Sequence, residues 1–125
     1  MTSHALLIED NAENRYLATF LLERHGWKVS AADDGPRGLE LAPRLMPTLI
    51  LLDIQLPGMD GYAVARALRA DPRVAQIPIV AVTSYAMPGD RERCMASGCN
   101  GYIEKPIDPD TFVREVAAFA AGAQP

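Results

Sequence analysis

Short apolar runs alternate with longer amphipathic segments along this chain. The most uniform run is residues 48–52, in which every residue is apolar or β-branched. A run without alternation is typical of a central parallel strand covered by helices on both faces. Asp53 follows where this strand should end, and Pro57 and Gly58 then break the backbone. Because ligands bind at the carboxyl ends of parallel strands, Asp53 is either a reactive group or the cap of a turn or helix.

The same reasoning predicts four more strands and five helices. The other strands are expected at 5–8, 27–31, 77–82 and 101–104. The helices are expected at 12–25, 35–45, 61–70, 90–97 and 109–120. Asn11, Asp60 and Asp108 are the expected caps, and Asp34 opens the second helix.

Three of these segments carry further expectations. Pro43 lies inside the second helix, where a proline costs about 3 kcal/mol, so this helix should be the weakest. Residues 85–89 are expected to form a mobile loop. The apolar positions of the first helix fall at helical spacing and are Tyr16, Leu17, Phe20 and Leu21.

Strands that alternate with helices through short connections predict an α/β domain. Such a domain has a parallel sheet, right-handed crossovers and helices on both faces. We expect one doubly wound domain over residues 1–125, with a core of about 4–121 and no output domain. The chain shows no internal repeat or linker.

Composition narrows the choice of function. The net charge of −4 and the lack of a basic run argue against direct nucleic-acid binding. The apolar residues 5–8 are too few for a signal-peptide core or a membrane span, so a cytoplasmic protein is expected. Cys94 and Cys99 lack the spacing of a zinc pair and are too few for a disulfide scaffold, so they are expected to be ordinary thiols.

Polar residues end four of the five predicted strands. They are Glu9 and Asp10, Asp53, Thr83 and Ser84, and Lys105. These ends share one edge of a parallel sheet, where clustered carboxylates repel unless a cation offsets them. An oxygen-only donor set favours Mg²⁺, with Lys105 as a second positive charge. Carboxylates, Mg²⁺, a hydroxyl and a lysine together describe a site that handles a phosphoryl group.

In these motifs the chain resembles the receiver domains of two-component response regulators. The residues that carry the resemblance are Glu9-Asp10-Asn11, Asp53 with Pro57-Gly58-Met59-Asp60-Gly61, Thr83, and Tyr102-Ile103-Glu104-Lys105-Pro106. They cover essentially the whole chain in the right order. The resemblance implies a flavodoxin-like sheet of strand order 2-1-3-4-5.

The resemblance also implies a role for each site residue. Asp53 would accept a phosphoryl group from a phosphohistidine of a histidine kinase or a phosphotransfer protein. Mg²⁺ would be held by Asp10, by Asp53 and by the backbone carbonyl of Gln55. Glu9 would contact the ion from another side. Many relatives have aspartate at the position of Glu9, and the longer glutamate favours a contact through water.

Lys105 and Thr83 would contact the oxygens of the phosphoryl group in such a domain. The resemblance also implies a cis peptide bond between Lys105 and Pro106, a form that would aim the lysine at the site. Thr83 and Tyr102 would be the switch residues. Their movement would change a surface, built by the fourth helix, fifth strand and fifth helix, on which a downstream protein docks. The chain would then be a regulatory phosphoacceptor and no enzyme.

Three alternatives remain at this point. The chain resembles stand-alone receivers and also the receiver modules of hybrid histidine kinases. A Mg²⁺-dependent phosphohydrolase that forms an aspartyl-phosphate is less favoured, because no second acid is placed as a general acid. A constitutive interaction module with an inactive acid cluster is the third alternative.

Overall fold

A five-stranded parallel sheet forms the centre of the molecule, in the order β2-β1-β3-β4-β5 that the resemblance implied. The computed structural model describes residues 3–84 and 87–122. The strands are β1 (His4–Ile8), β2 (Lys28–Ala32), β3 (Leu49–Asp53), β4 (Ile79–Thr83) and β5 (Gly101–Glu104). The helices are α1 (Ala12–Arg24), α2 (Gly35–Leu45), α3 (Gly61–Ala70), α4 (Asp90–Ala96) and α5 (Phe112–Ala120).

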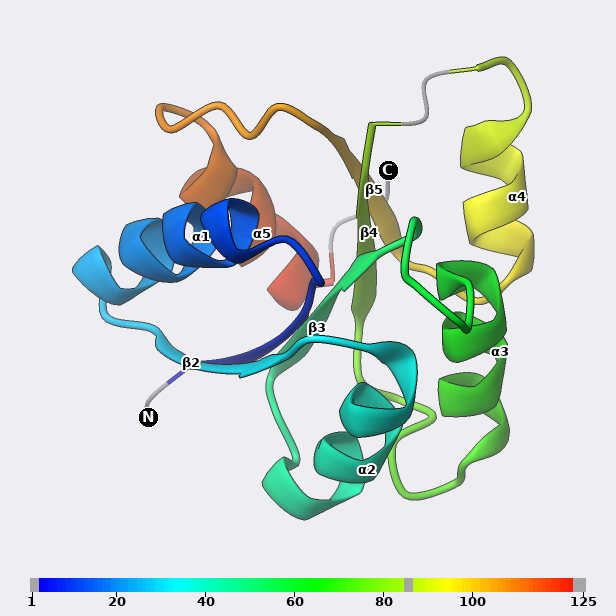
Figure 1. The fold of residues 1–125 in the computed structure, drawn as a ribbon. Coiled ribbons are helices and arrows are strands. Elements are labelled where there is room, and N and C mark those ends of the chain that lie inside the picture. The colour runs from blue at the N-terminus through cyan, green and yellow to red at the C-terminus, as the bar shows by residue number, and fades with distance from the viewer. Residues whose placement is uncertain (1–2, 85–86, 123–125) are drawn as a thin grey trace.

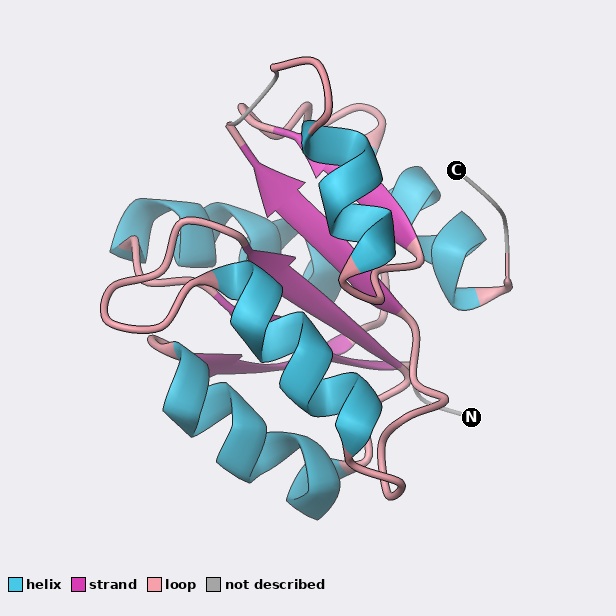
Figure 2. Cartoon of the chain, turned by 90° about the vertical axis from the view of Figure 1, so that its right-hand side faces the viewer, coloured by secondary structure: helices cyan, strands magenta, loops and turns pink. Residues whose placement is uncertain are grey.

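The helices form a layer on each face of the sheet. Helices α1 and α5 lie together on one side, and α2, α3 and α4 lie on the other (Figure 1). Figure 2 views the molecule from the side of α2, α3 and α4, with the strands behind them. The predicted doubly wound α/β architecture is therefore confirmed.

Each helical layer covers its own hydrophobic core. Alternate residues of one strand point to opposite faces of the sheet, so Ile50 and Leu52 of β3 pack into one core while Leu49 and Leu51 pack into the other. Every residue of β3 and β4 is buried. Burial on both faces explains why the sequence of β3 shows no apolar and polar alternation.

Side-chain caps begin three of the helices. Asn11 accepts a hydrogen bond from the Asn14 amide at 2.9 Å. Asp34 and Asp60 make the equivalent bond to the amides of Arg37 (2.8 Å) and Ala63 (2.9 Å). The predicted starts of α1, α2 and α3 are thus correct, and each cap stabilises its helix by about 1 kcal/mol.

Two predicted starts were wrong by two residues or more, whereas the starts of β1, β2 and β3 differ from the expected ones by a single residue. Strand β4 begins at Ile79 and not at Ile77, because the Ile77 amide closes a turn onto the Val74 carbonyl and Pro78 has no amide to donate. Helix α5 begins at Phe112, whereas the sequence suggested a start after Asp108. The Asp108 carboxylate caps a turn over 108–111 instead, through the Asp110 amide at 2.9 Å.

The apolar stripe expected on α1 was partly wrong as well. Tyr16 and Phe20 are 71% and 43% exposed, and their rings stack with centroids 6.1 Å apart. The buried face of α1 is formed by Ala18, Leu21 and Leu22. Residues 18, 21 and 22 have the spacing of one helical face, and the aromatic pair lies on the opposite side of the helix.

Helix α2 continues through Pro43 to Leu45, so the proline does not end it early. Its expected low stability stays a prediction. The mobile loop expected at 85–89 falls partly on residues 85 and 86, which lie outside the described residues. Over the part of the chain that the structure describes, no helix is long and apolar enough to cross a membrane.

Candidate phosphoryl and metal site

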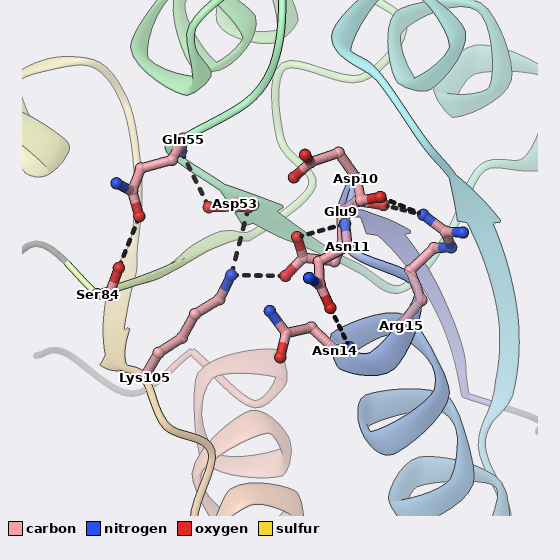
Figure 3. Close-up of polar contacts among 9 residues, drawn as sticks. All are labelled: Glu9, Asp10, Asn11, Asn14, Arg15, Asp53, Gln55, Ser84 and Lys105. Atoms are coloured by element: carbon pink, nitrogen blue, oxygen red, sulfur yellow. Dashed lines mark hydrogen bonds and ion pairs between the residues drawn. The ribbon is translucent and has the colours of Figure 1, made fainter.

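Three carboxylates meet at the carboxyl edge of the sheet. Glu9 and Asp10 follow β1, and Asp53 is the last residue of β3. Because Ile8 pairs with Leu52 in the parallel ladder, the next residue of each strand lies at the same edge. One carboxylate oxygen from each of the three acids lies within 4.8 Å of the others. Figure 3 shows this cluster with its neighbours.

Lys105 supplies the positive charge of the cluster. Its ammonium nitrogen lies 2.7 Å from Glu9 Oε1 and 3.3 Å from Asp53 Oδ2 (Figure 3). The Lys105 amide donates to the Thr83 carbonyl at 2.9 Å, which anchors the loop after β5 to the end of β4. The peptide bond between Lys105 and Pro106 is cis.

Burial and the close Glu9 carboxylate control ionisation in this cluster. Burial, followed by the hydrogen bond with Glu9, raises the pKa of Asp53 from 3.8 to about 7, although Lys105 opposes this. Burial also disfavours the charged form of Glu9, but hydrogen bonds with Asp53 and Lys105 outweigh it and lower the pKa of Glu9. The pair therefore holds one proton below neutral pH, and the opposite directions of the two pKa shifts favour its location on Asp53.

The loop after Asp53 folds tightly against the strand end. The Gln55 amide donates to Asp53 Oδ1 at 2.9 Å, and the Gly61 amide donates to the Ile54 carbonyl at 2.9 Å. A Cβ on Gly61 would lie 2.5 Å from the Ile54 Cα and 2.6 Å from the Asp53 carbonyl oxygen. Only glycine lets the start of α3 lie this close to the acid.

The structure adds a residue to the site that the sequence did not single out. Arg15 donates through Nη1 to the carbonyls of Glu9 (2.8 Å) and Asp10 (2.9 Å). The Asn11 amide donates to Glu9 Oε2 at 3.2 Å. These bonds hold the loop that carries two of the carboxylates. Arg15 is one of ten arginines, and no motif marks it in the sequence.

The acid cluster opens to solvent through a cavity of about 490 Å³. Ser84, the residue after β4, lines this cavity and donates from Oγ to Gln55 Oε1 at 2.6 Å. Thr83 is buried at the end of β4, directly after Val82, which pairs with Asp53. The residues that line the cavity are Glu9, Asp10, Asn11, Asn14, Asp53, Gln55, Ser84, Lys105 and Pro106.

Tyr102 lies away from this cavity. It is half-buried in β5, packs against the core on the α2 and α3 side, and lines a second cavity of about 340 Å³ with Arg91 and Phe112. The structure therefore gathers Glu9, Asp10, Asp53, Gln55 and Lys105 at one point. It leaves Tyr102 at the edge strand.

The donor set fits a hard divalent cation. All the candidate ligand atoms are carboxylate oxygens, and the Lys105 ammonium group pairs with two of the three carboxylates. Such a set suits Mg²⁺ better than zinc or copper, which favour nitrogen and sulfur ligands.

Fold and site together define a receiver domain of two-component signalling. The profile of the response regulator receiver domain family matches residues 5–117, and the chain belongs to this family. Among curated relatives it is similar to the polar-differentiation response regulator DivK of Brucella ovis. The two are 38% identical over 123 residues, which is 98% of this chain and 100% of the relative.

Solved structures are similar over nearly the whole chain. The receiver domain of a sensor histidine kinase from Pseudomonas aeruginosa has a TM-score of 0.89 and 33% identity, covering 98% of this chain and 100% of that one. That domain was solved with a magnesium ion coordinated in its active-site cleft. The chemotaxis protein CheY4 of Vibrio cholerae has a TM-score of 0.88 and 25% identity, covering 94% of this chain and 98% of that one.

Proposed function

We propose that this chain is a cytoplasmic, phosphorylation-switched receiver that accepts a phosphoryl group on Asp53. The donor is a phosphohistidine of a histidine kinase or a histidine phosphotransfer protein. A carboxylate oxygen of Asp53 forms the new bond to phosphorus as the bond from phosphorus to the imidazole nitrogen breaks. The imidazole then takes a proton from solvent. The observation that carries this proposal is the Asp53 carboxylate, which belongs to an oxygen-only cluster of three acids and lies 3.3 Å from the Lys105 ammonium group.

Mg²⁺ would be held by the side chains of Asp10 and Asp53 and by the backbone carbonyl of Gln55. When bound, the ion supplies positive charge that offsets the acids and the incoming phosphoryl oxygens. Both oxygens of Glu9 already have partners, since Oε1 pairs with Lys105 and Oε2 accepts from the Asn11 amide. This supports a contact of Glu9 to the ion through water. Asp10 is exposed and free to turn toward a metal.

Lys105 and Thr83 would bind the transferred group. The Lys105 ammonium already lies 3.3 Å from Asp53 Oδ2, so a small movement brings it to a phosphoryl oxygen. Lysine suits this role because its charge is compact and its stem is flexible. Thr83 would donate its hydroxyl to another oxygen, drawing the end of β4 toward the site.

Phosphorylation would change the surface formed by α4, β5 and α5, on which a downstream protein docks. Movement of Thr83 would allow Tyr102 to turn, and a downstream protein would read the changed surface. The cavity of about 340 Å³ supports this view, because it lies on that surface and Tyr102 lines it together with Arg91 and Phe112. Couplings of this kind are typically about 1–3 kcal/mol.

Phosphorylation of matched variants tests the proposal. The chain is incubated with Mg²⁺ and phosphoramidate, a small donor with the same phosphorus–nitrogen bond, and uptake is followed by intact mass. Wild type should gain one phosphoryl group and Asp53→Asn none. Asp60→Asn is the control, because it changes a nearby carboxylate while an asparagine still caps α3. Uptake by Asp53→Asn equal to that of wild type would contradict the assignment.

A further inference from the structure

Two cysteines meet where α4 ends. The Cys99 amide donates to the Cys94 carbonyl at 3.1 Å, and the Gly98 amide donates to the Met95 carbonyl at 3.0 Å. Gly98 has a φ of +108°, the left-handed conformation that this helix ending requires. A contact between the side chains at these two positions frequently accompanies a Schellman ending, and both cysteines belong to one hydrophobic cluster. The turn thus pairs two thiols that lie five positions apart in the sequence.

The two thiols are shielded from solvent and lie in one hydrophobic cluster. Cys94 and Cys99 are both buried, and both belong to the core on the side of α2, α3 and α4. The hydrogen bond with Cys99 lowers the pKa of Cys94 despite its burial, and a hydrogen bond with Tyr62 adds to this effect. The same bond to Cys94, together with burial, raises the pKa of Cys99. These opposite shifts favour Cys94 as the nucleophile of the pair.

We propose that Cys94 and Cys99 are a reversible redox pair that closes to a disulfide when the chain meets a hydroperoxide. The Cys94 thiolate attacks the peroxide oxygen, the O–O bond breaks, and an alcohol or water leaves. The sulfenic acid formed on Cys94 then reacts with the Cys99 thiol, forming the S–S bond and releasing water. Overall two thiols lose two hydrogens and one hydroperoxide is reduced. This inference concerns α4 alone and does not depend on phosphorylation of Asp53.

Local opening of α4 gives the oxidant access to the thiols. The helix has seven residues, and it starts after Gly89, which makes no side-chain cap hydrogen bond. Short helices without caps open at lower cost than the rest of a domain. Once formed, the disulfide would join the last turn of α4 to the segment that enters β5. It would also convert the Cys94 thiol, which lies in the same hydrophobic cluster as Tyr62, to a disulfide.

Oxidation of the full chain and of single-cysteine variants provides the first test. Wild type is treated with hydrogen peroxide, unfolded, alkylated and weighed intact. The expected product is a monomer that has lost two hydrogens, carries no alkyl group and regains both thiols with a reductant. Cys94→Ser and Cys99→Ser should not form it. Oxidation of wild type to sulfinic or sulfonic acid, or to a disulfide between two chains, would overturn the proposal.

The second test asks whether the fold itself favours the bond. The ratio of disulfide to dithiol is measured in glutathione buffers for the folded chain and for the chain in urea. If the Schellman ending pairs the thiols, folding should raise this ratio at least about tenfold. An equal or lower ratio in the folded chain would overturn the proposal.

A pair of glycine variants tests whether the turn at Gly98 is what favours the disulfide. Gly98→Ala strains the ending of α4, because its Cβ would lie 2.5 Å from the Arg69 side chain and its φ is positive. Gly26→Ala is the matched control, since Gly26 also has a positive φ, near the end of α1, with no atom within 4 Å of its Cβ. The ratio should fall in Gly98→Ala and stay unchanged in Gly26→Ala. Equal ratios in the two variants would contradict a role for this turn.

Discussion

The ammonium group of Lys105 lies closer to Glu9 than to Asp53, at 2.7 Å from Glu9 Oε1 and 3.3 Å from Asp53 Oδ2. Lys105 therefore chiefly neutralises Glu9, and Asp53 stays protonated up to about neutral pH, with a pKa of about 7. The proposed phosphoacceptor thus lacks a full partner charge before a metal or a phosphoryl group arrives. This arrangement leads to three predictions, and the hydrogen bonds of Arg15 lead to a fourth.

Replacing Glu9 should lower the pKa of Asp53. Burial is the main cause of the raised value and Glu9 the next, so Glu9→Gln should bring the pKa below about 7 without returning it to 3.8. The measurement is a carboxyl-carbon NMR titration of the metal-free chain. Asp60→Asn serves as a control and should leave the Asp53 titration where it is. A pKa that is the same in Glu9→Gln and wild type would contradict the role given to Glu9.

Magnesium affinity should rise with pH until Asp53 is ionised. Binding requires the carboxylate, so the apparent affinity should increase about tenfold per pH unit below the Asp53 pKa of about 7 and level off above it. Isothermal titration at several pH values measures this. In Asp53→Asn the affinity should be weaker and the steep rise should disappear. A wild-type affinity independent of pH would show that Asp53 is not a ligand.

The same raised pKa makes Asp53 a source of instability above neutral pH in metal-free protein. Its pKa rises from 3.8 in the unfolded chain to about 7 on folding, so its favourable contribution is complete below 3.8 and is lost as pH rises through about 7. Glu9 has a lowered pKa and acts in the opposite sense, with stability lost as pH falls. The difference in the free energy of unfolding between Asp53→Asn and wild type isolates the contribution of Asp53.

Asp53→Asn should therefore gain free energy of unfolding relative to wild type as pH increases from about 5 to about 8. Urea denaturation in the presence of a chelator measures this. Added Mg²⁺ should reduce the gain, because the ion stabilises the ionised carboxylate of wild type. A difference that stays constant over this pH range would contradict the shift assigned to Asp53.

Arg15 should support the metal site without being a ligand. Arg15→Met removes two hydrogen bonds to the carbonyls of Glu9 and Asp10, and we expect a loss of about 1–2 kcal/mol in stability. Magnesium affinity should weaken by about fivefold as the loop loses its anchor. Arg66→Met, at an exposed position on α3, is the matched control. Equal magnesium affinity in Arg15→Met and Arg66→Met would contradict a role of Arg15 in supporting the metal site.

Local patterns determined much of the fold. The uniform run at 48–52 identified the buried strand β3. A strand covered by helices on both faces has no solvent-facing positions, so its sequence does not alternate between apolar and polar residues. Asn11 and Asp60 marked the starts of α1 and α3, because a cap bonds to an amide only three residues away. The three acids and Lys105 could be grouped for a related reason, since all strands of a parallel sheet end at one edge, whereas Gln55 and Tyr102 were suggested only by the family resemblance.

Only the tertiary structure decided which of these residues touch. The bond between Lys105 and Glu9 joins residues 96 positions apart, and its length depends on the whole backbone path between them. The exposure of Tyr16 and Phe20 depends on which side of α1 faces the sheet, and the pairing of Cys94 with Cys99 depends on the left-handed turn at Gly98. The spacing of apolar residues in the sequence reveals whether a segment has the period of a helix or of a strand. Contacts between elements follow from how the elements pack, which no local pattern records.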